Sequence, residues 1–229
     1  METESSDKEY EIKPMSIDPP STEKEDQFTW RWRDLLIMIL GIFGLLILGA
    51  VIFVASSVIR GENLEKILVP TINQTLALTA LEAIALSLGI YLFGLKRRKL
   101  GWDSVGIRSM SWTWLLISIT VTLIMIPVVS LITLIVLFLS GQPMENPQLD
   151  FLLPEGLSAI DGIFMLILAG IVAPFGEELL FRGVLYSFLR ERWGIWVGIF
   201  VSSLLFGLIH GNLAVGLTGF LLGIVAALV

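Results

Sequence analysis

The sequence predicts an all-α fold, a polytopic bundle of about six transmembrane helices. Of its 229 residues, 55% are hydrophobic and only 16% are charged, whereas about a quarter of the residues of a soluble domain are charged. The apolar residues are collected into runs, several of which have the ~20 residues that a helix needs to cross a hydrocarbon core. No segment alternates apolar and polar residues as a half-buried strand does. We therefore expect a multi-pass membrane protein.

The amino-terminal segment differs from the rest in charge, and we expect residues 1–28 to form a disordered acidic tail ahead of a transmembrane domain at 29–229. Residues 1–27 hold nine acids and three bases, which accounts for the whole formal charge of -6. This segment lacks the basic start of a signal peptide. The remainder has no clustered basic face, so no nucleic-acid partner is expected. The chain has no cysteine, which excludes disulfides, thiolate metal sites and a cysteine nucleophile.

The apolar runs give the expected membrane spans in order. Trp and Arg residues within Phe28–Arg33 form an interfacial anchor directly before the first span. The third and fourth spans contain Pro127 and Pro174, each of which should kink its helix because proline cannot donate the backbone hydrogen bond. The predicted spans are 35–59, 76–95, 112–139, 160–190, 195–209 and 213–229.

Glu82 lies inside the second span, where a carboxyl group must face the protein interior, pair with another group or take up a proton. Two interpretations are open: Glu82 contributes to a functional site, or it packs against a Thr or Asn. The second is preferred at this point.

Lysine and arginine in the short connections predict the orientation in the membrane. From the segment before the first span onward, successive connections contain three, two, five, none and two of these residues. The alternation places the amino terminus, the loop at Lys96–Lys99 and the turn at Trp193 in the cytoplasm. We expect a multi-pass protein of the cell membrane with a cytoplasmic amino terminus.

The strongest functional signal is a pair of motifs on either side of a turn at Trp193–Gly194. The first is Glu177-Glu178-x-x-x-Arg182, and the second is Phe206-x-x-x-His210. Glu177 and His210 are each about 16.5 residues from the turn, or roughly 25 Å along a helix. Two antiparallel helices would therefore bring them to the same depth.

Within each motif, the residues four apart share a helix face. Glu178 should pair with Arg182, Phe206 should lie beside His210, and Glu177 points about 100° away from Glu178. Ionisable residues at membrane depth cost about 2.5 to 3.5 kcal/mol each and mark function by default. A plainer interpretation is that the charged residues form an ion-pair cluster near the membrane interface and that His210 is a hydrogen-bonded interior histidine.

These residues suit hydrolysis by an activated water molecule. Glu177, facing His210, is the expected base, and its partner would hold the water or donate to the developing oxyanion. The candidate catalytic residues are Glu177, Glu178 and His210, with Arg182 and Phe206 in support. A divalent metal such as zinc, bound by Glu177 and His210, ranks lower, since a catalytic zinc usually takes three protein ligands.

The two motifs resemble those of the CAAX-protease and bacteriocin-processing family, also called the abortive-infection family. The resemblance covers about the last third of the chain, includes Phe-Arg-Gly at 181–183, and implies a protease-like core at about 160–229 of a multi-spanning intramembrane endopeptidase. Family members carry a further helix with a second His and an Asn or Asp four residues later, after a stretch like Phe220 to Gly223. The sequence stops at Val229 without that helix, so the resemblance implies a core that lacks this contribution, and the activity is in doubt.

Three functions remain open from the sequence. The first is an endopeptidase that cleaves hydrophobic or prenylated peptides in the lipid bilayer. The second is a non-catalytic immunity or scaffold protein. The third is a segment of a proton-coupled transporter, in which Glu82 and the paired glutamates relay protons. The sequence does not determine the substrate, the recognition of a prenyl group, or the oligomeric state.

Overall fold

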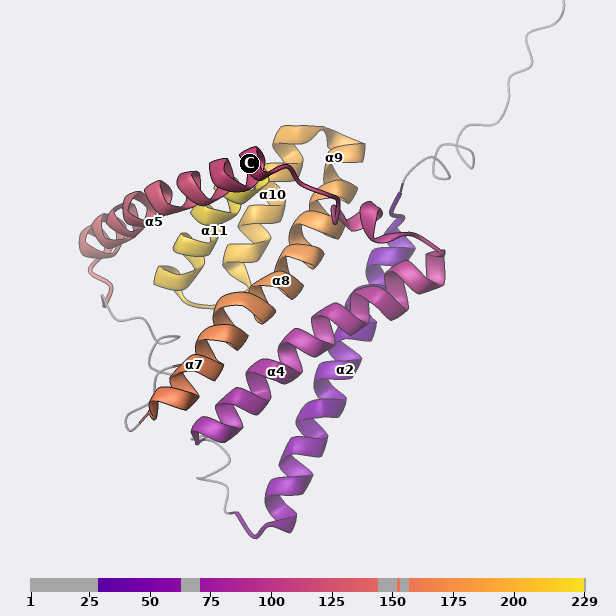
Figure 1. Ribbon diagram of the computed structural model, residues 1–229, viewed down its shortest axis with the longest axis vertical. Coiled ribbons are helices and arrows are strands. Elements are labelled where there is room, and N and C mark those ends of the chain that lie inside the picture. Colours follow the sequence, from indigo (N-terminus) through magenta and orange to yellow (C-terminus); the bar gives the residue numbers. More distant parts are fainter. Residues whose placement is uncertain (1–28, 63–70, 144–151, 153–156, 229) are drawn as a thin grey trace, which may run out of the picture.

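The computed structural model describes residues 29–62, 71–143, 152 and 157–228. In this part of the chain every regular element is a helix, which confirms the predicted all-α fold (Figure 1). The acidic tail predicted for residues 1–28 lies outside the described residues. Val229, the last residue of the sixth predicted span, does so too.

Helices occur at all six predicted spans. Four are long and apolar enough to cross a membrane: Trp32–Ile59, Ile72–Lys96, Trp112–Ser140 and Ala159–Trp193. The first of these is α2 (Trp32–Ile59). The second consists of α4 (Ile72–Gly89) and the π-helix η1 (Ile90–Lys96), and the third is α5 (Trp112–Ser140). Two shorter apolar helices follow, α10 (Ile195–Leu208) and α11 (Leu213–Leu228).

The fourth long helix changes its winding several times. It consists of α7 (Ala159–Ile167), the π-helix η3 (Leu168–Val172), α8 (Ala173–Glu178), the π-helix η4 (Leu179–Tyr186) and α9 (Ser187–Trp193). Pro174 is the second residue after the end of η3, and the wider π-helical turn accommodates the backbone hydrogen bond that proline cannot donate. π-Helical turns often occur at functional sites.

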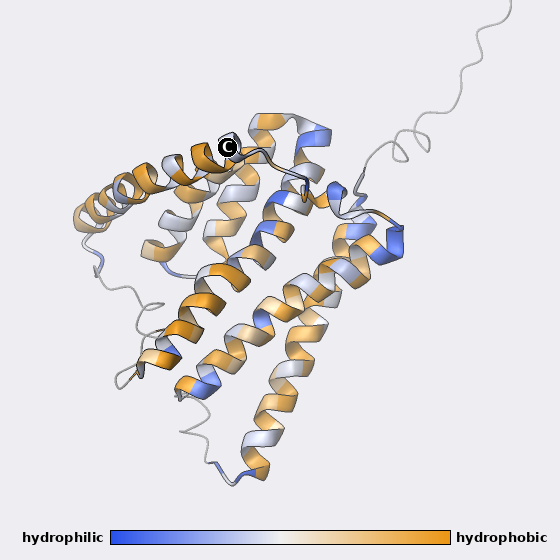
Figure 2. Cartoon of the chain, in the orientation of Figure 1, coloured by the Kyte–Doolittle hydropathy of each residue, from blue (hydrophilic) through white to orange (hydrophobic). Residues whose placement is uncertain are grey.

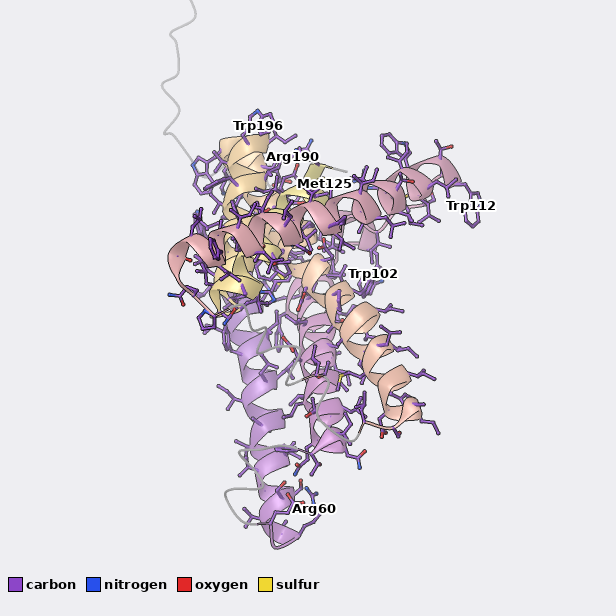
Figure 3. The ribbon with its side chains drawn as sticks, turned by 90° about the vertical axis from the view of Figure 1, so that its left-hand side faces the viewer. Arg60, Trp102, Trp112, Met125, Arg190 and Trp196 are labelled. Atoms are coloured by element: carbon purple, nitrogen blue, oxygen red, sulfur yellow. The ribbon has the colours of Figure 1, made fainter. Side chains whose placement is uncertain are left out.

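Helix α5 departs from the arrangement of the other long helices. It is continuous through Pro127, so the predicted kink does not interrupt the helix. Figures 1 and 3 show α5 crossing the bundle at a steep angle to α2 and α4. It packs mainly on α11, where the hydroxyl oxygens of Thr133 and Thr218 are 3.1 Å apart.

The amino-terminal anchor lies partly inside the protein. Trp32 is exposed, as an interfacial anchor should be, but Trp30 is fully buried in the core, which corrects the prediction for that residue. Close by, the buried carboxylate of Asp34 forms ion pairs with Arg97 and Arg98 at the end of the second long helix. Hydrophilic residues gather at this end of the bundle, whereas its middle is mostly apolar, with a few hydrophilic stretches on α4 and on the helix that includes α8 (Figure 2).

Candidate active site

The two motifs lie on a helical hairpin, as predicted. Helix α9 ends at Trp193, α10 begins at Ile195, and Gly194 makes the turn with a φ of +87°, a backbone conformation that favours glycine. The two arms run side by side in Figure 1. Helix α11 packs closely on α10, because the backbones touch at Gly207 and Gly216: a Cβ atom on Gly207 would lie 2.4 Å from the Gly216 carbonyl oxygen.

Glu177 and His210 line one cavity of about 240 Å³, which we call the inner cavity. Glu177 comes from α8, and His210 follows the end of α10. Both side chains are half-buried. The prediction that they face the same space thus agrees with the geometry. The cavity also contains Glu82 and is otherwise apolar, with side chains of Ile39, Ile42, Phe43, Leu46, Leu86, Leu180, Phe181, Phe206 and Ile209.

Glu82 joins the site, although it was not among the candidate catalytic residues. It belongs to α4, is exposed, and lies on the rim of the inner cavity. Among the described residues it makes no hydrogen bond with a Thr or Asn, and its place in the inner cavity favours the other interpretation, a contribution to the site. The only sequence signal was an acid in the middle of an apolar span.

His210 is oriented by its own helix. Its Nδ1 atom lies 2.7 Å from the carbonyl oxygen of Phe206. A carbonyl can only accept a hydrogen bond, so Nδ1 carries the proton, and in the neutral ring Nε2 has a free lone pair. The Phe206 ring stands edge-on to the imidazole with centroids 5.0 Å apart, which confirms the predicted contact.

Glu178 and Arg182 form the predicted pair, with Arg182 Nε 3.4 Å from Glu178 Oε2. The guanidinium group also lies over the Phe206 ring, 4.7 Å from its centroid. Phe206 is therefore held between Arg182 and His210. Because its carbonyl oxygen binds the imidazole, Arg182 can influence the position of His210 without touching it.

Small residues make room for this arginine. A Cβ atom on Gly223 of α11 would lie 2.8 Å from Arg182 Nη2 and 3.1 Å from Ser203 Oγ. Ser203 is fully buried, and its hydroxyl has no hydrogen-bond partner among the described residues. The sequence gave no signal of a role for Ser203, and Gly223 stands out there only within the stretch 220–223.

Glu178 lies in a different cavity from Glu177. This larger cavity, of about 970 Å³, is lined by Glu178 and Arg182 together with Tyr186 and Arg190, and we call it the Arg182 cavity. The structure thus brings together Glu177, His210 and Glu82, and it separates Glu178 from them.

An apolar groove leads from the inner cavity along α2. Two further cavities, of about 420 and 680 Å³, share lining residues with the inner cavity and with each other. Ile39 of α2 lines all three. The opposite wall is formed by η4 and α10, with Leu185 and Leu205. The row of cavities ends beside Trp193 at the hairpin turn.

The donors present do not fit a zinc ion. Within the described ranges, no three His, Asp or Glu side chains lie close enough together to hold a metal. A catalytic zinc usually takes three protein ligands and leaves one position open.

A family model covers the same part of the chain. A family model described as type II CAAX prenyl endopeptidase Rce1-like matches residues 159–229. An Escherichia coli protein, named only as an uncharacterized 24.3 kDa protein, is 37% identical over 79 residues. That match covers 33% of this chain and 36% of the relative. No solved structure matches significantly. The matched segment contains both motifs, so residues 159–229 are similar to the type II CAAX prenyl endopeptidase Rce1-like family, in agreement with the resemblance seen in the sequence.

Proposed function

We propose that this protein is an intramembrane endopeptidase that hydrolyses peptide bonds with a water molecule activated by Glu177. The observation that carries the proposal is that Glu177 and His210 line the same inner cavity. Apart from these two residues and Glu82, the lining of this cavity is apolar. The family of residues 159–229 supports the same reaction class.

In this mechanism, Glu177 removes a proton from water as the water oxygen attacks the peptide carbonyl carbon. His210 orients the water, because its unprotonated Nε2 accepts a hydrogen bond from the second water proton. Glu177 then returns the proton to the amide nitrogen as the C–N bond breaks. Glu178 and Arg182 position Phe206, and through it His210, without contacting the substrate.

The substrate we propose is a hydrophobic or prenylated peptide that enters from the lipid bilayer. The apolar groove between α2 and the hairpin supports this, because it leads to the inner cavity and offers almost no polar groups. An unpaired peptide backbone would be costly there, since it would find few hydrogen-bond partners. A hydrocarbon chain has no polar groups that need partners, and a helical segment pairs its own backbone groups. We further propose that the hairpin turn faces the cytoplasm, from the distribution of Lys and Arg.

The test is cleavage of a membrane-anchored reporter peptide in proteoliposomes. Glu177→Gln should reduce the rate about 10²- to 10⁴-fold, the usual contribution of a general base, while the amount of folded protein stays unchanged. Glu178→Gln is the matched control on the adjacent residue and should lose less activity. Cleavage by Glu177→Gln at the wild-type rate would refute the assignment. No cleavage by the wild-type protein on any reporter would favour a scaffold role.

A proton-coupled transporter is a second candidate, because Glu82 and Glu177 line the same cavity. Two carboxyl groups near each other at membrane depth are typical of proton relays. Proton uptake into vesicles that is lost in Glu82→Gln, with reporter cleavage unaffected, would favour this function over the peptidase.

A further inference from the structure

The Arg182 cavity takes no part in the proposed hydrolysis, yet its walls carry many polar groups. One wall is a face of the long helix with charged or hydroxyl-bearing side chains at every fourth position: Glu178, Arg182, Tyr186 and Arg190. The other walls are the connection that follows η1, from Asp103 to Arg108, and the end of α11. Small-molecule sites span roughly 300–1,000 Å³. At about 970 Å³, this cavity is large enough to hold a ligand.

The connection wall lies at the level of the membrane–water boundary. It begins in the 3-10 helix η2 (Trp102–Val105), where the exposed ring of Trp102 stacks on that of Tyr91 with centroids 5.9 Å apart. Exposed Trp and Tyr rings of membrane proteins gather at the level of the lipid headgroups. Val105 packs directly on the long helix, because a Cβ atom on Gly183 would lie 2.7 Å from its carbonyl oxygen. This part of the cavity is therefore close to headgroup level.

Three guanidinium groups of the cavity offer hydrogen-bond donors. Arg182 is mostly buried, and its Nε and Nη1 atoms have no hydrogen-bond partner in the described part of the chain. Arg108 and Arg190 are exposed on two different walls, and neither forms an ion pair with another described residue. Guanidinium groups are common partners of phosphate, which they bind through two parallel hydrogen bonds. The lining thus suits a ligand with a phosphate group.

Carboxylates balance these arginines. Glu178 pairs with Arg182, and Glu191 accepts a hydrogen bond from the backbone N–H of Thr29 at 3.0 Å. Asp103 forms no ion pair within the described ranges. With three arginines and three acids, the lining has no net charge. A ligand with only negative charge would leave carboxylates without a partner, whereas a ligand with both a phosphate and a cation meets both kinds of group.

The cavity also has an apolar end. Phe175 and Leu179 line it from the long helix, and Ala226 and Ala227 line it from α11. Phe175 is exposed and lies on the side away from the hairpin turn, whereas Arg190 lies close to the turn. The two ends of this wall are roughly 20 Å apart along the helix axis. A ligand with one polar and one apolar end fits along it better than a small soluble ion does.

We propose that the Arg182 cavity binds one membrane phospholipid with a zwitterionic headgroup, a phosphodiester that also carries a primary ammonium. Arg108, Arg182 and Arg190 donate hydrogen bonds to the phosphate oxygens. The ammonium has three donors and pairs with the carboxylates of Asp103 and Glu191. The acyl chains extend along the apolar end of the cavity.

The test is lipid binding by the full chain in detergent, measured by native mass spectrometry. The probes are phosphatidylethanolamine, phosphatidylcholine and phosphatidylglycerol with the same acyl chains. The first carries a primary ammonium, the second a quaternary one, and the third no cation. Water-soluble glycerophosphoethanolamine serves as a competitor, because it has the headgroup without acyl chains.

The double variant Arg108→Gln/Arg190→Gln removes two exposed arginines from the cavity walls. Lys96→Gln/Lys99→Gln is the matched control, because it removes the same charge from exposed residues near η2 that do not line the cavity. Thermal unfolding without lipid checks that both variants are folded. If the arginine variant does not fold, Arg108→Gln alone gives the same readout with a smaller effect.

We expect one phosphatidylethanolamine per chain. The arginine variant should bind it about 2- to 25-fold more weakly, the combined effect of two exposed ion pairs, and the control variant should bind it as the wild type does. The wild type should prefer phosphatidylethanolamine to phosphatidylcholine, because a quaternary ammonium has no N–H to donate. Asp103→Asn should reduce that preference.

Equal binding of phosphatidylethanolamine by the wild type and the arginine variant would overturn the proposal, because the lipid would then bind elsewhere on the apolar surface. Tighter binding of phosphatidylglycerol would overturn the zwitterionic headgroup. Glycerophosphoethanolamine that binds as tightly as the lipid would overturn the assignment to a lipid and indicate a soluble ligand. No readout involves hydrolysis, so the result is independent of the proposed peptidase activity.

Discussion

Replacing Gly207 by alanine should push α10, the helix that leads to His210, away from α11. The added Cβ atom would lie 2.4 Å from the Gly216 carbonyl oxygen and 3.0 Å from the Phe220 Cβ. The nearest atom belongs to the backbone, so no side-chain rotation relieves the contact and α10 must move away from α11. Overpacking of this kind costs about 1–3 kcal/mol. Gly207 precedes His210 by one turn, so the imidazole should move as well.

The assay is thermal unfolding in detergent, followed by the fluorescence of the seven tryptophans. A loss of 1 kcal/mol lowers the midpoint by about 2–4 °C for a chain of 150–250 residues, so we expect a fall of about 2–12 °C. Gly219→Ala on α11 is the matched control, because its nearest contact would be an ordinary 3.4 Å from the Phe206 ring. That variant should be neutral or gain up to about 1 kcal/mol from helix propensity. If Gly207→Ala is as stable as Gly219→Ala, the close α10–α11 packing is not as described.

Two further predictions concern the charged groups. Arg182→Lys should lower the rate of reporter cleavage roughly 5- to 30-fold, equivalent to the 1–2 kcal/mol of a partly desolvated contact with the Phe206 ring. This loss is smaller than the one expected for Glu177→Gln. An unchanged rate would show that Arg182 does not position His210. Asp34→Asn should destabilise the protein by about 1–3 kcal/mol, less than a fully buried pair because both partner arginines are partly exposed. The more exposed pair of Glu62 with Arg60 serves for comparison: Glu62→Gln should cost less than Asp34→Asn in the same unfolding assay, and equal losses would contradict the difference in burial.

The hairpin was predictable because its geometry is local. The separation of Glu178 and Arg182 by four residues fixes their pairing, and counting from the glycine turn at Gly194 fixes which residues of the two arms meet. These arguments need only helix geometry. The same is true of the contact between Phe206 and His210.

The contribution of other helices was not predictable in this way. A helix in a membrane is apolar on nearly all faces, so the sequence does not reveal which face packs on a neighbour. Glu82 belongs to the inner cavity only because α4 packs on α8, and Trp30 is buried only because the start of α2 meets η1. The steep crossing of α5 is likewise a matter of tertiary packing, and the π-helical stretches leave no clear signal in the sequence.

The separation of Glu177 from Glu178 explains how adjacent acids can have different roles. Consecutive residues on a helix point about 100° apart, so one carboxylate can face an apolar cavity while the next faces a polar one. Arg182 occupies the interior next to α11 and is costly there unless it is paired, which Glu178 provides. Glu177 thereby has no ion pair with an arginine in the described part of the chain, and it faces His210 across the inner cavity. In the proposed mechanism, the first motif therefore contains two functional units: Glu178 and Arg182 stabilise the arrangement that holds Phe206 and His210, and Glu177 is free to act on water.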